Sequence, residues 1–157
     1  MFKYRVRFKL DIEDALEYDD SEQYAEITEI DDECFDKTFD TDEKIKEFEN
    51  WYNDGYDSSS EKINVKNIVY DRQDEDTGIL EVTLNDKLKD EKTFADELVT
   101  YLFEGDYPTV RYHVTGTTYE DYWDYHRGSP EQRTIPVDYE DSTSIHSFSN
   151  VEIEEIH

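Results

Sequence analysis

The chain has 157 residues, among them 43 Asp and Glu but only 16 Lys and Arg, which gives a formal net charge of -27. A chain of this length can bury one core of its own, and so negative a surface is repelled by nucleic-acid phosphates and by anionic membranes. Charged residues reach 38% and hydrophobic residues 35%, a balance close to that of disordered chains, but the 15% aromatic content supplies large surfaces for burial. We therefore expect one folded domain with an acidic surface, without direct contact to nucleic acid or membrane.

The N-terminal segment, residues 1–13, alternates between apolar and charged side chains. The apolar ones are Phe2, Tyr4, Val6, Phe8, Leu10 and Ile12. A half-buried strand places such residues on one side, whereas a helix would scatter them around its axis. The opposite side carries four cations, which are Lys3, Arg5, Arg7 and Lys9. This strand is therefore expected to be apolar on one face and basic on the other.

An acidic segment follows the first strand. Between Asp11 and Asp36 there are thirteen carboxylates and no Lys or Arg. Within it, residues 24–30 contain β-formers in rough alternation, which indicates a second short strand. If this strand returns alongside the first one, its acids lie opposite the cations, and each such pair contributes about 0.2 to 1 kcal/mol.

A helix and a hairpin are predicted next. Asp40 and Glu43 have capping-box spacing at the start of a helix that ends at Gly55. Residues 63–84 are expected to form a long hairpin, because two segments with β-branched residues flank a polar turn.

A second helix and a further strand follow the hairpin. The helix opens at Asp90 or Thr93, and Gly105 closes it. Residues 110–115 then alternate between apolar and polar side chains, which predicts a strand with Arg111 and His113 on its outer face.

Without the second strand, the predicted order is β-α-β-β-α-β, the split arrangement of ferredoxin-like folds. The expected fold class is α+β, a single domain with a mainly antiparallel sheet and two helices on one face, and residues 1–116 form its core domain. The first strand is then central, and the strand at residues 110–115 is its neighbour. The helix-free face would carry a basic stripe of Lys3, Arg5, Arg7, Lys9, Arg111 and His113.

Residues 117–157 are predicted to form an aromatic and acidic C-terminal arm that packs on the core. The segment from Tyr119 to Tyr125 interleaves four aromatic residues with three acids, and it is either a capped helical turn or extended. A strand is expected at residues 151–156. The basic sheet face is the expected seat of the arm, because cations beside so many carboxylates attract a cover.

Patterns for catalysis and metal binding are missing from the sequence. We find no phosphate loop, dinucleotide, serine-hydrolase or zincin motif, so we expect neither enzyme activity nor a cofactor. The acids before Gly78 depart from calcium-loop spacing and the four histidines are scattered, so no metal site is expected. Cys34 is the single cysteine, which excludes an intramolecular disulfide, and its acidic neighbours are expected to raise its pKa.

The start of the chain does not have the pattern of a signal peptide. Its cations alternate with apolar residues, and no apolar run approaches the length of a membrane span. We expect a soluble, intracellular and cytoplasmic protein.

The charge balance favours a non-enzymatic binding protein that occupies a basic surface of a partner. The groove of a DNA- or RNA-binding protein is such a surface, because its Lys and Arg track phosphates, and a nucleic-acid mimic inhibits the protein by filling it. Small acidic inhibitors of viruses and mobile elements work this way as a class. The predicted partner-binding residues are Asp19, Asp20, Glu22, Asp31, Asp32, Glu33, Tyr119, Glu120, Asp121, Tyr122, Trp123, Asp124 and Tyr125.

The main alternative is a structural or scaffold subunit of a larger assembly, for example a viral one, that docks through the aromatic arm and strand edges. Association that is lost at high salt would favour the charge mechanism, and salt-insensitive association would favour the scaffold. An RNA reader that uses the basic face is a third reading. It is disfavoured because Phe2, Tyr4 and Phe8 share the inner face, whereas such readers place aromatic residues outward.

Overall fold

The computed structural model describes residues 1–55, 61–124 and 129–157, and for residues 120–124 and 129–132 it describes the backbone alone. Within these residues the protein has four helices and two antiparallel sheets, one of four strands and one of three. This confirms the predicted α+β class. In chain order the elements are β1 (Phe2–Leu10), α1 (Ile12–Ala15), β2 (Gln23–Asp31), α2 (Glu33–Thr38), α3 (Asp42–Asn53), β3 (Val65–Arg72), β4 (Thr77–Leu84), α4 (Glu91–Glu104), β5 (Thr109–Asp124), β6 (Ser129–Ser144) and β7 (Phe148–Ile156).

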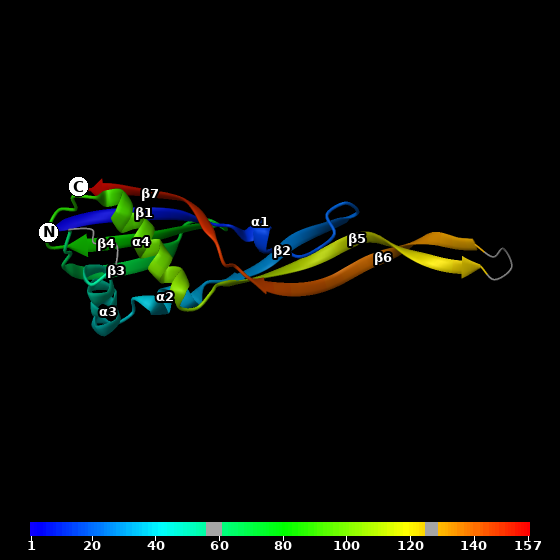
Figure 1. Cartoon of the computed structure of the whole chain (residues 1–157), viewed down its shortest axis with the longest axis horizontal. Coiled ribbons are helices and arrows are strands. Elements are labelled where there is room, and N and C mark those ends of the chain that lie inside the picture. The colour runs from blue at the N-terminus through cyan, green and yellow to red at the C-terminus, as the bar shows by residue number, and fades with distance from the viewer. Residues whose placement is uncertain (56–60, 125–128) are drawn as a thin grey trace.

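The main sheet has the strand order β3-β4-β1-β7, and its neighbouring strands are all antiparallel. With α3 and α4 as the two connecting helices, these strands follow the predicted β-α-β-β-α-β order, and the helices pack on one face of the sheet (Figure 1). β1 is central, as predicted. Its second neighbour is β7, so the expectation that residues 110–115 take this place is wrong. β7 suits the place because Val151 and Ile153 pack against the core, while Glu152 and Glu154, which alternate with them, are exposed beside the cations of β1.

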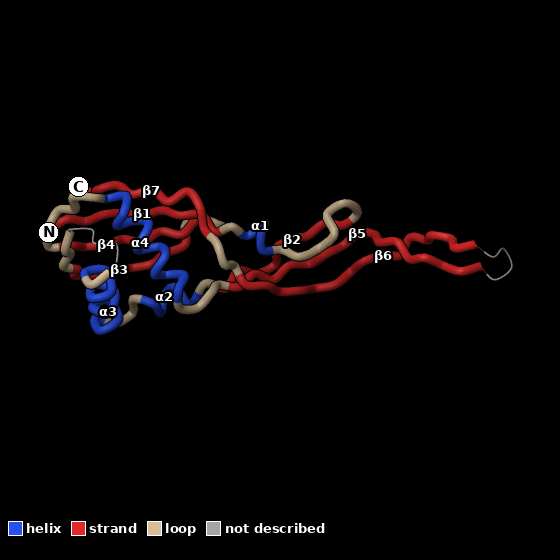
Figure 2. The backbone as a smooth tube through the Cα atoms, in the orientation of Figure 1, coloured by secondary structure: helices blue, strands red, loops and turns tan. Residues whose placement is uncertain are grey.

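The second sheet has the strand order β2-β5-β6. The predicted strand at residues 24–30 is present as β2, but it pairs with β5 because β4 and β7 occupy both edges of β1. β5 and β6 form a long hairpin that projects from the main sheet, so the molecule is elongated (Figure 1, Figure 2). Its accessible surface of 10237 Å² exceeds the roughly 8,300 Å² expected for a compact protein of 18.8 kDa.

Residues 117–157 contribute to both sheets. Residues 117–124 continue β5, and residues 129–144 form its partner β6. The predicted strand at residues 151–156 is present as part of β7, which pairs with the edge of β1 and does not cover its basic face. The division into a core domain and an arm at residue 116 stays a prediction.

Two of the cations on β1 form ion pairs with nearby carboxylates, and Lys9 lies 4.0 Å from Asp76. Arg5 forms ion pairs with Glu81 of β4 and Glu154 of β7, with 3.3 Å between nitrogen and oxygen in each. The neighbouring strands thus neutralise Arg5, whereas Lys3 and Arg7 form no ion pair among the described residues. Arg111 and His113 lie on β5 in the second sheet, so their predicted place in this stripe is wrong.

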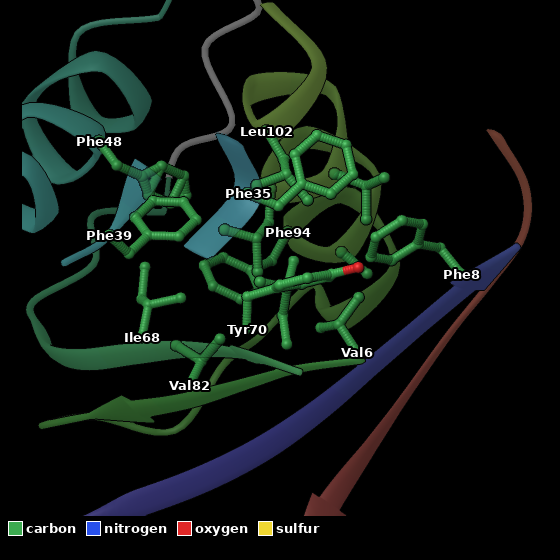
Figure 3. Close-up of a cluster of buried hydrophobic side chains, with 14 of the residues drawn as sticks. Val6, Phe8, Phe35, Phe39, Phe48, Ile68, Tyr70, Val82, Phe94 and Leu102 are labelled. Atoms are coloured by element: carbon green, nitrogen blue, oxygen red, sulfur yellow. The ribbon is translucent and has the colours of Figure 1, made fainter. Parts of the chain in front are cut away.

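The core lies between the main sheet and helices α2, α3 and α4, and aromatic rings fill much of it (Figure 3). Phe35 of α2 is fully buried, and its ring centroid lies 5.0 Å from that of Phe103, 5.4 Å from that of Tyr70 and 6.3 Å from that of Phe8. These contacts are edge-to-face, the favoured geometry for aromatic pairs. The aromatic content of this acidic chain therefore supplies its core, as the composition predicts.

Both long helices begin at side-chain caps. The Thr41 hydroxyl accepts a hydrogen bond from the backbone N–H of Lys44 at 3.2 Å, so α3 is capped one residue later than the predicted Asp40. The Asp90 carboxylate accepts from the backbone N–H of Thr93 at 3.1 Å, which confirms one of the two predicted starts of α4. Each cap satisfies a backbone donor that the helix cannot pair internally.

Truncation of Phe35 tests how far the fold depends on the aromatic cluster. Phe35→Ala is expected to lower the free energy of unfolding by about 3–5 kcal/mol, because it removes a fully buried ring and leaves a cavity among three others. Urea denaturation followed by circular dichroism measures this. Val69→Ala, at a side chain that is 51% exposed, is the control and should change stability by less than about 0.5 kcal/mol. Equal effects of the two changes would contradict this account of the core.

Candidate functional site on the second sheet

The two faces of the second sheet differ because β5 alternates. Val110, Tyr112 and Val114 are buried on one face, where the segment after α1 reaches the sheet. There the Tyr112 hydroxyl donates to the backbone carbonyl of Glu17 at 3.1 Å and accepts from its N–H at 3.2 Å. The opposite face of the sheet is directed to solvent.

Carboxylates from β2 and β6 flank the middle strand on this solvent face. In the register, Glu26 and Glu140 lie on either side of His113, and Glu29 and Asp138 are further members of the same two rows. We call this surface the acidic face, and its carboxylates are Glu26, Glu29 and Asp31 of β2 and Asp138 and Glu140 of β6. All five residues are exposed.

The middle strand holds the two rows of the acidic face together. Arg111 lies 3.8 Å from Glu29, and His113 contacts the carboxylate of Asp138. Because β5 separates β2 from β6, the two rows run about 10 Å apart, twice the spacing of hydrogen-bonded strands. Backbone ladders fix that spacing, so the two rows of carboxylates are attached to strands at a fixed separation.

The predicted residues Glu22 and Tyr119 are brought together where β2 begins. The Tyr119 hydroxyl donates to Glu22 Oε1 at 3.3 Å, and the carbonyl of Glu22 accepts from the N–H of Thr117 at 3.0 Å. Gly116 makes this approach possible, because a Cβ there would lie 2.3 Å from the Glu22 carbonyl oxygen. Its φ of +132° also favours glycine. The predicted Asp19 and Asp20 are exposed in the same loop.

The predicted residues Asp31, Asp32 and Glu33 lie at the opposite end of β2, where α2 begins. Asp32 accepts a hydrogen bond from the Tyr70 hydroxyl at 2.6 Å and lies 3.7 Å from Arg72, and its side chain is only 14% exposed. Burial and the adjacent Asp32 raise the pKa of Tyr70, which keeps the hydroxyl protonated as a donor. Asp32 therefore joins α2 to β3, while Asp31 remains exposed as part of the acidic face.

The predicted aromatic segment is extended rather than helical up to Asp124, since β5 pairs with β6 as far as that residue. Tyr119 is half-exposed. The side chains of Glu120, Asp121, Tyr122, Trp123 and Asp124, and the whole of Tyr125, lie outside the described residues.

Four carboxylates of the acidic face, Glu26, Glu29, Asp138 and Glu140, are absent from the predicted site. Strict alternation over residues 24–30 would place Glu26 and Glu29 on opposite sides of a strand, and the register shift between Ile27 and Glu29 brings them to the same side. The pairing with β5 and β6 that assembles the face carries no local sequence signal.

Exposed tyrosines gather around the second sheet. Among the described residues, four of the six exposed large hydrophobic side chains belong to it or to the loop before β5, and they are Tyr24, Tyr107, Tyr119 and Tyr139. Tyr24 is 76% exposed and shares the acidic face, two residues before Glu26. Tyrosine beside charged groups is typical of protein interfaces.

Three further features of the described part of the chain bear on its chemistry. No group of three or more His, Cys, Asp or Glu there is arranged to hold a metal ion, and no helix there is long and apolar enough to cross a membrane. Burial raises the pKa of the Cys34 thiol to about 11, and Asp106 adds to this effect. The pKa of Cys34 is raised as predicted, although burial contributes more than its acidic neighbours.

No protein-family model matches the chain, and no curated protein and no solved structure is significantly similar to it. Any functional conclusion therefore depends on the geometry and charge of the molecule itself.

The raised pKa of Cys34 makes its thiol slow to react. Alkylation by iodoacetamide at about pH 8 should be roughly a hundredfold slower than for a free cysteine of pKa about 8.5, because so little thiolate is present. The rate should still rise tenfold per unit at about pH 9.5, where a free thiol has reached its plateau. Asp106→Asn should increase the rate at pH 8. A plateau near pH 9 would contradict the raised pKa.

Gly116→Ala should separate the Glu22 loop from β5. We expect a loss of about 1–3 kcal/mol in the free energy of unfolding, because the new methyl group clashes with the Glu22 carbonyl and the backbone conformation is strained. Gly105→Ala is the matched control, since nothing lies within 4 Å of a Cβ at that position. Thermal or urea denaturation gives both values, and equal effects at the two glycines would count against the tight approach at Gly116.

Proposed function

We propose that this protein is a non-enzymatic acidic binding protein that occupies the nucleic-acid groove of a DNA- or RNA-binding partner through its acidic face. Its role is to compete with the nucleic acid as a mimic of the phosphate backbone.

The observation that carries this proposal is the pair of carboxylate rows on β2 and β6. Their separation of about 10 Å falls between the widths of the minor and major grooves of B-DNA, about 6 Å and 12 Å, across which two phosphate strands face each other. A partner whose Lys and Arg are placed to hold two phosphate strands therefore meets a comparable spacing of negative charge. Because the rows belong to one sheet, little ordering of the backbone is needed on binding.

The local charge supports a basic partner. Residues 16–31, 107–119 and 133–144, which make up the described second sheet and its loop, contain ten Asp and Glu but two Arg. Such a surface raises the rate of encounter with a cationic groove and repels nucleic acid itself. Tyr24 offers an aromatic anchor within the same face.

A scaffold role is the second candidate, and the exposed tyrosines favour it together with the outer edges of β2 and β6. Both strands end the second sheet, so each has one edge without a neighbouring strand among the described residues. A partner that binds there would add a strand and bury Tyr139 or Tyr107. The strength of such an association depends little on salt.

The test is competition with nucleic acid by a matched pair of charge variants. One variant neutralises the acidic face with Glu26→Gln, Glu29→Gln, Asp138→Asn and Glu140→Gln. The control neutralises four exposed acids away from it, with Glu43→Gln, Glu47→Gln, Asp54→Asn and Asp86→Asn. Both variants lose the same charge, so any difference in partner capture between them comes from where the neutralised acids lie. Partners captured on the wild-type protein are challenged with a DNA or RNA duplex and with a salt series.

Neutralising the acidic face should weaken capture by about tenfold or more, since four ion pairs of up to about 1 kcal/mol each are lost. The control should stay within about threefold of the wild type. Duplex nucleic acid should release the partner, and raised salt should do the same. Equal weakening of both variants, or a partner that resists duplex and salt, would reject the mimic and support the scaffold.

A further inference from the structure

A hollow beside β7 of the main sheet is lined mostly by charged residues and is separate from the acidic face. It measures about 420 Å³ and is lined by residues of β1, α4 and β7. This volume is in the range of small-molecule sites, roughly 300–1,000 Å³. Its charged lining residues are Arg5, Arg7, Lys92, Asp96, Glu152 and Glu154.

Two of the three cations already have partners. Arg5 pairs with Glu154 at 3.3 Å, and Lys92 lies 3.6 Å from Asp96. Arg7 forms no ion pair within the described residues, and its Nε is buried without any hydrogen-bond acceptor. Glu152 is its neighbour in the β1–β7 register, yet it is exposed and forms no ion pair with Arg7. The Arg7 side chain as a whole is only partly buried, but a buried N–H donor without an acceptor needs an explanation.

We propose that this hollow binds an aliphatic monocarboxylate, with the carboxylate on the guanidinium of Arg7. A guanidinium offers paired donors that fit the two oxygens of a carboxylate, and such charge-assisted bonds are the strong ones. The apolar part of the ligand lies against Ala95, Val151 and Ile153, which complete the wall. This site is separate from the acidic face and does not depend on the proposed function.

The neighbouring carboxylates select a single negative charge. Asp96, Glu152 and Glu154 surround the site, so a doubly charged phosphate meets about twice the repulsion of a carboxylate. Glu152 is the carboxylate that competes most directly with a ligand for Arg7. It lies opposite Arg7 in the register and forms no ion pair of its own among the described residues. Its removal therefore strengthens binding, an effect that a merely structural Arg7 would not show.

The experiment follows the Nε–H signal of Arg7 by nuclear magnetic resonance while hexanoate is added to the full chain. The wild type should show saturable binding of hexanoate, and hexanamide and inorganic phosphate should bind about tenfold more weakly or not at all. N-acetylleucine stands for the C-terminus of a peptide. If it binds more tightly than hexanoate, a peptide end is the natural source of the carboxylate, and the reverse order indicates a free acid.

Three variants complete the test. Arg7→Gln should weaken hexanoate binding about tenfold or more, Glu152→Gln should strengthen it, and Arg111→Gln, on the exposed side of the second sheet, should leave it unchanged. Glu152→Gln keeps the proposal testable if Arg7→Gln does not fold. Absence of saturable binding to the wild type, or equal binding of hexanoate and hexanamide, would overturn the proposal.

Discussion

The placement of a few cations among many carboxylates is the constraint on which this fold depends. With 43 acidic residues and 16 basic ones, most carboxylates cannot have a cationic partner. In the main sheet Arg5 lies on the inner strand β1 and meets acids of both neighbouring strands, and in the second sheet Arg111 and His113 lie on the inner strand β5. Arg5 between Glu81 and Glu154 is the clearest case, with 3.3 Å between nitrogen and oxygen in each pair. This arrangement lets each positive charge offset repulsion across a pair of strands.

The two sheets contribute differently to stability and to the proposed recognition. The main sheet and its helices bury the aromatic rings around Phe35, and this burial supplies the free energy that opposes the repulsion of the surface charges. The second sheet buries little beyond the side chains around Tyr112, and most of its area faces solvent. Stability and the proposed recognition therefore rest on different residues.

Local patterns in the sequence were sufficient for the elements but not for all of their neighbours. Alternation located β1 and β2, and the Asp90 cap located the start of α4. Residues 110–115 and β7 show the same alternation, and the sequence alone does not show which of the two pairs with β1. For the same reason the acidic face was missed. Glu26 and Glu140 are remote in sequence, and β5 alone makes them members of one surface.

Gly116 also sets the length over which the hairpin has a third strand. β2 begins opposite this residue, so the hairpin continues beyond it with β5 and β6 alone. Adding or removing two residues in each strand of that outer part would change the reach of the hairpin by about 7 Å and keep the same side chains on the same face. The span of the hairpin can thus change without any change at its base.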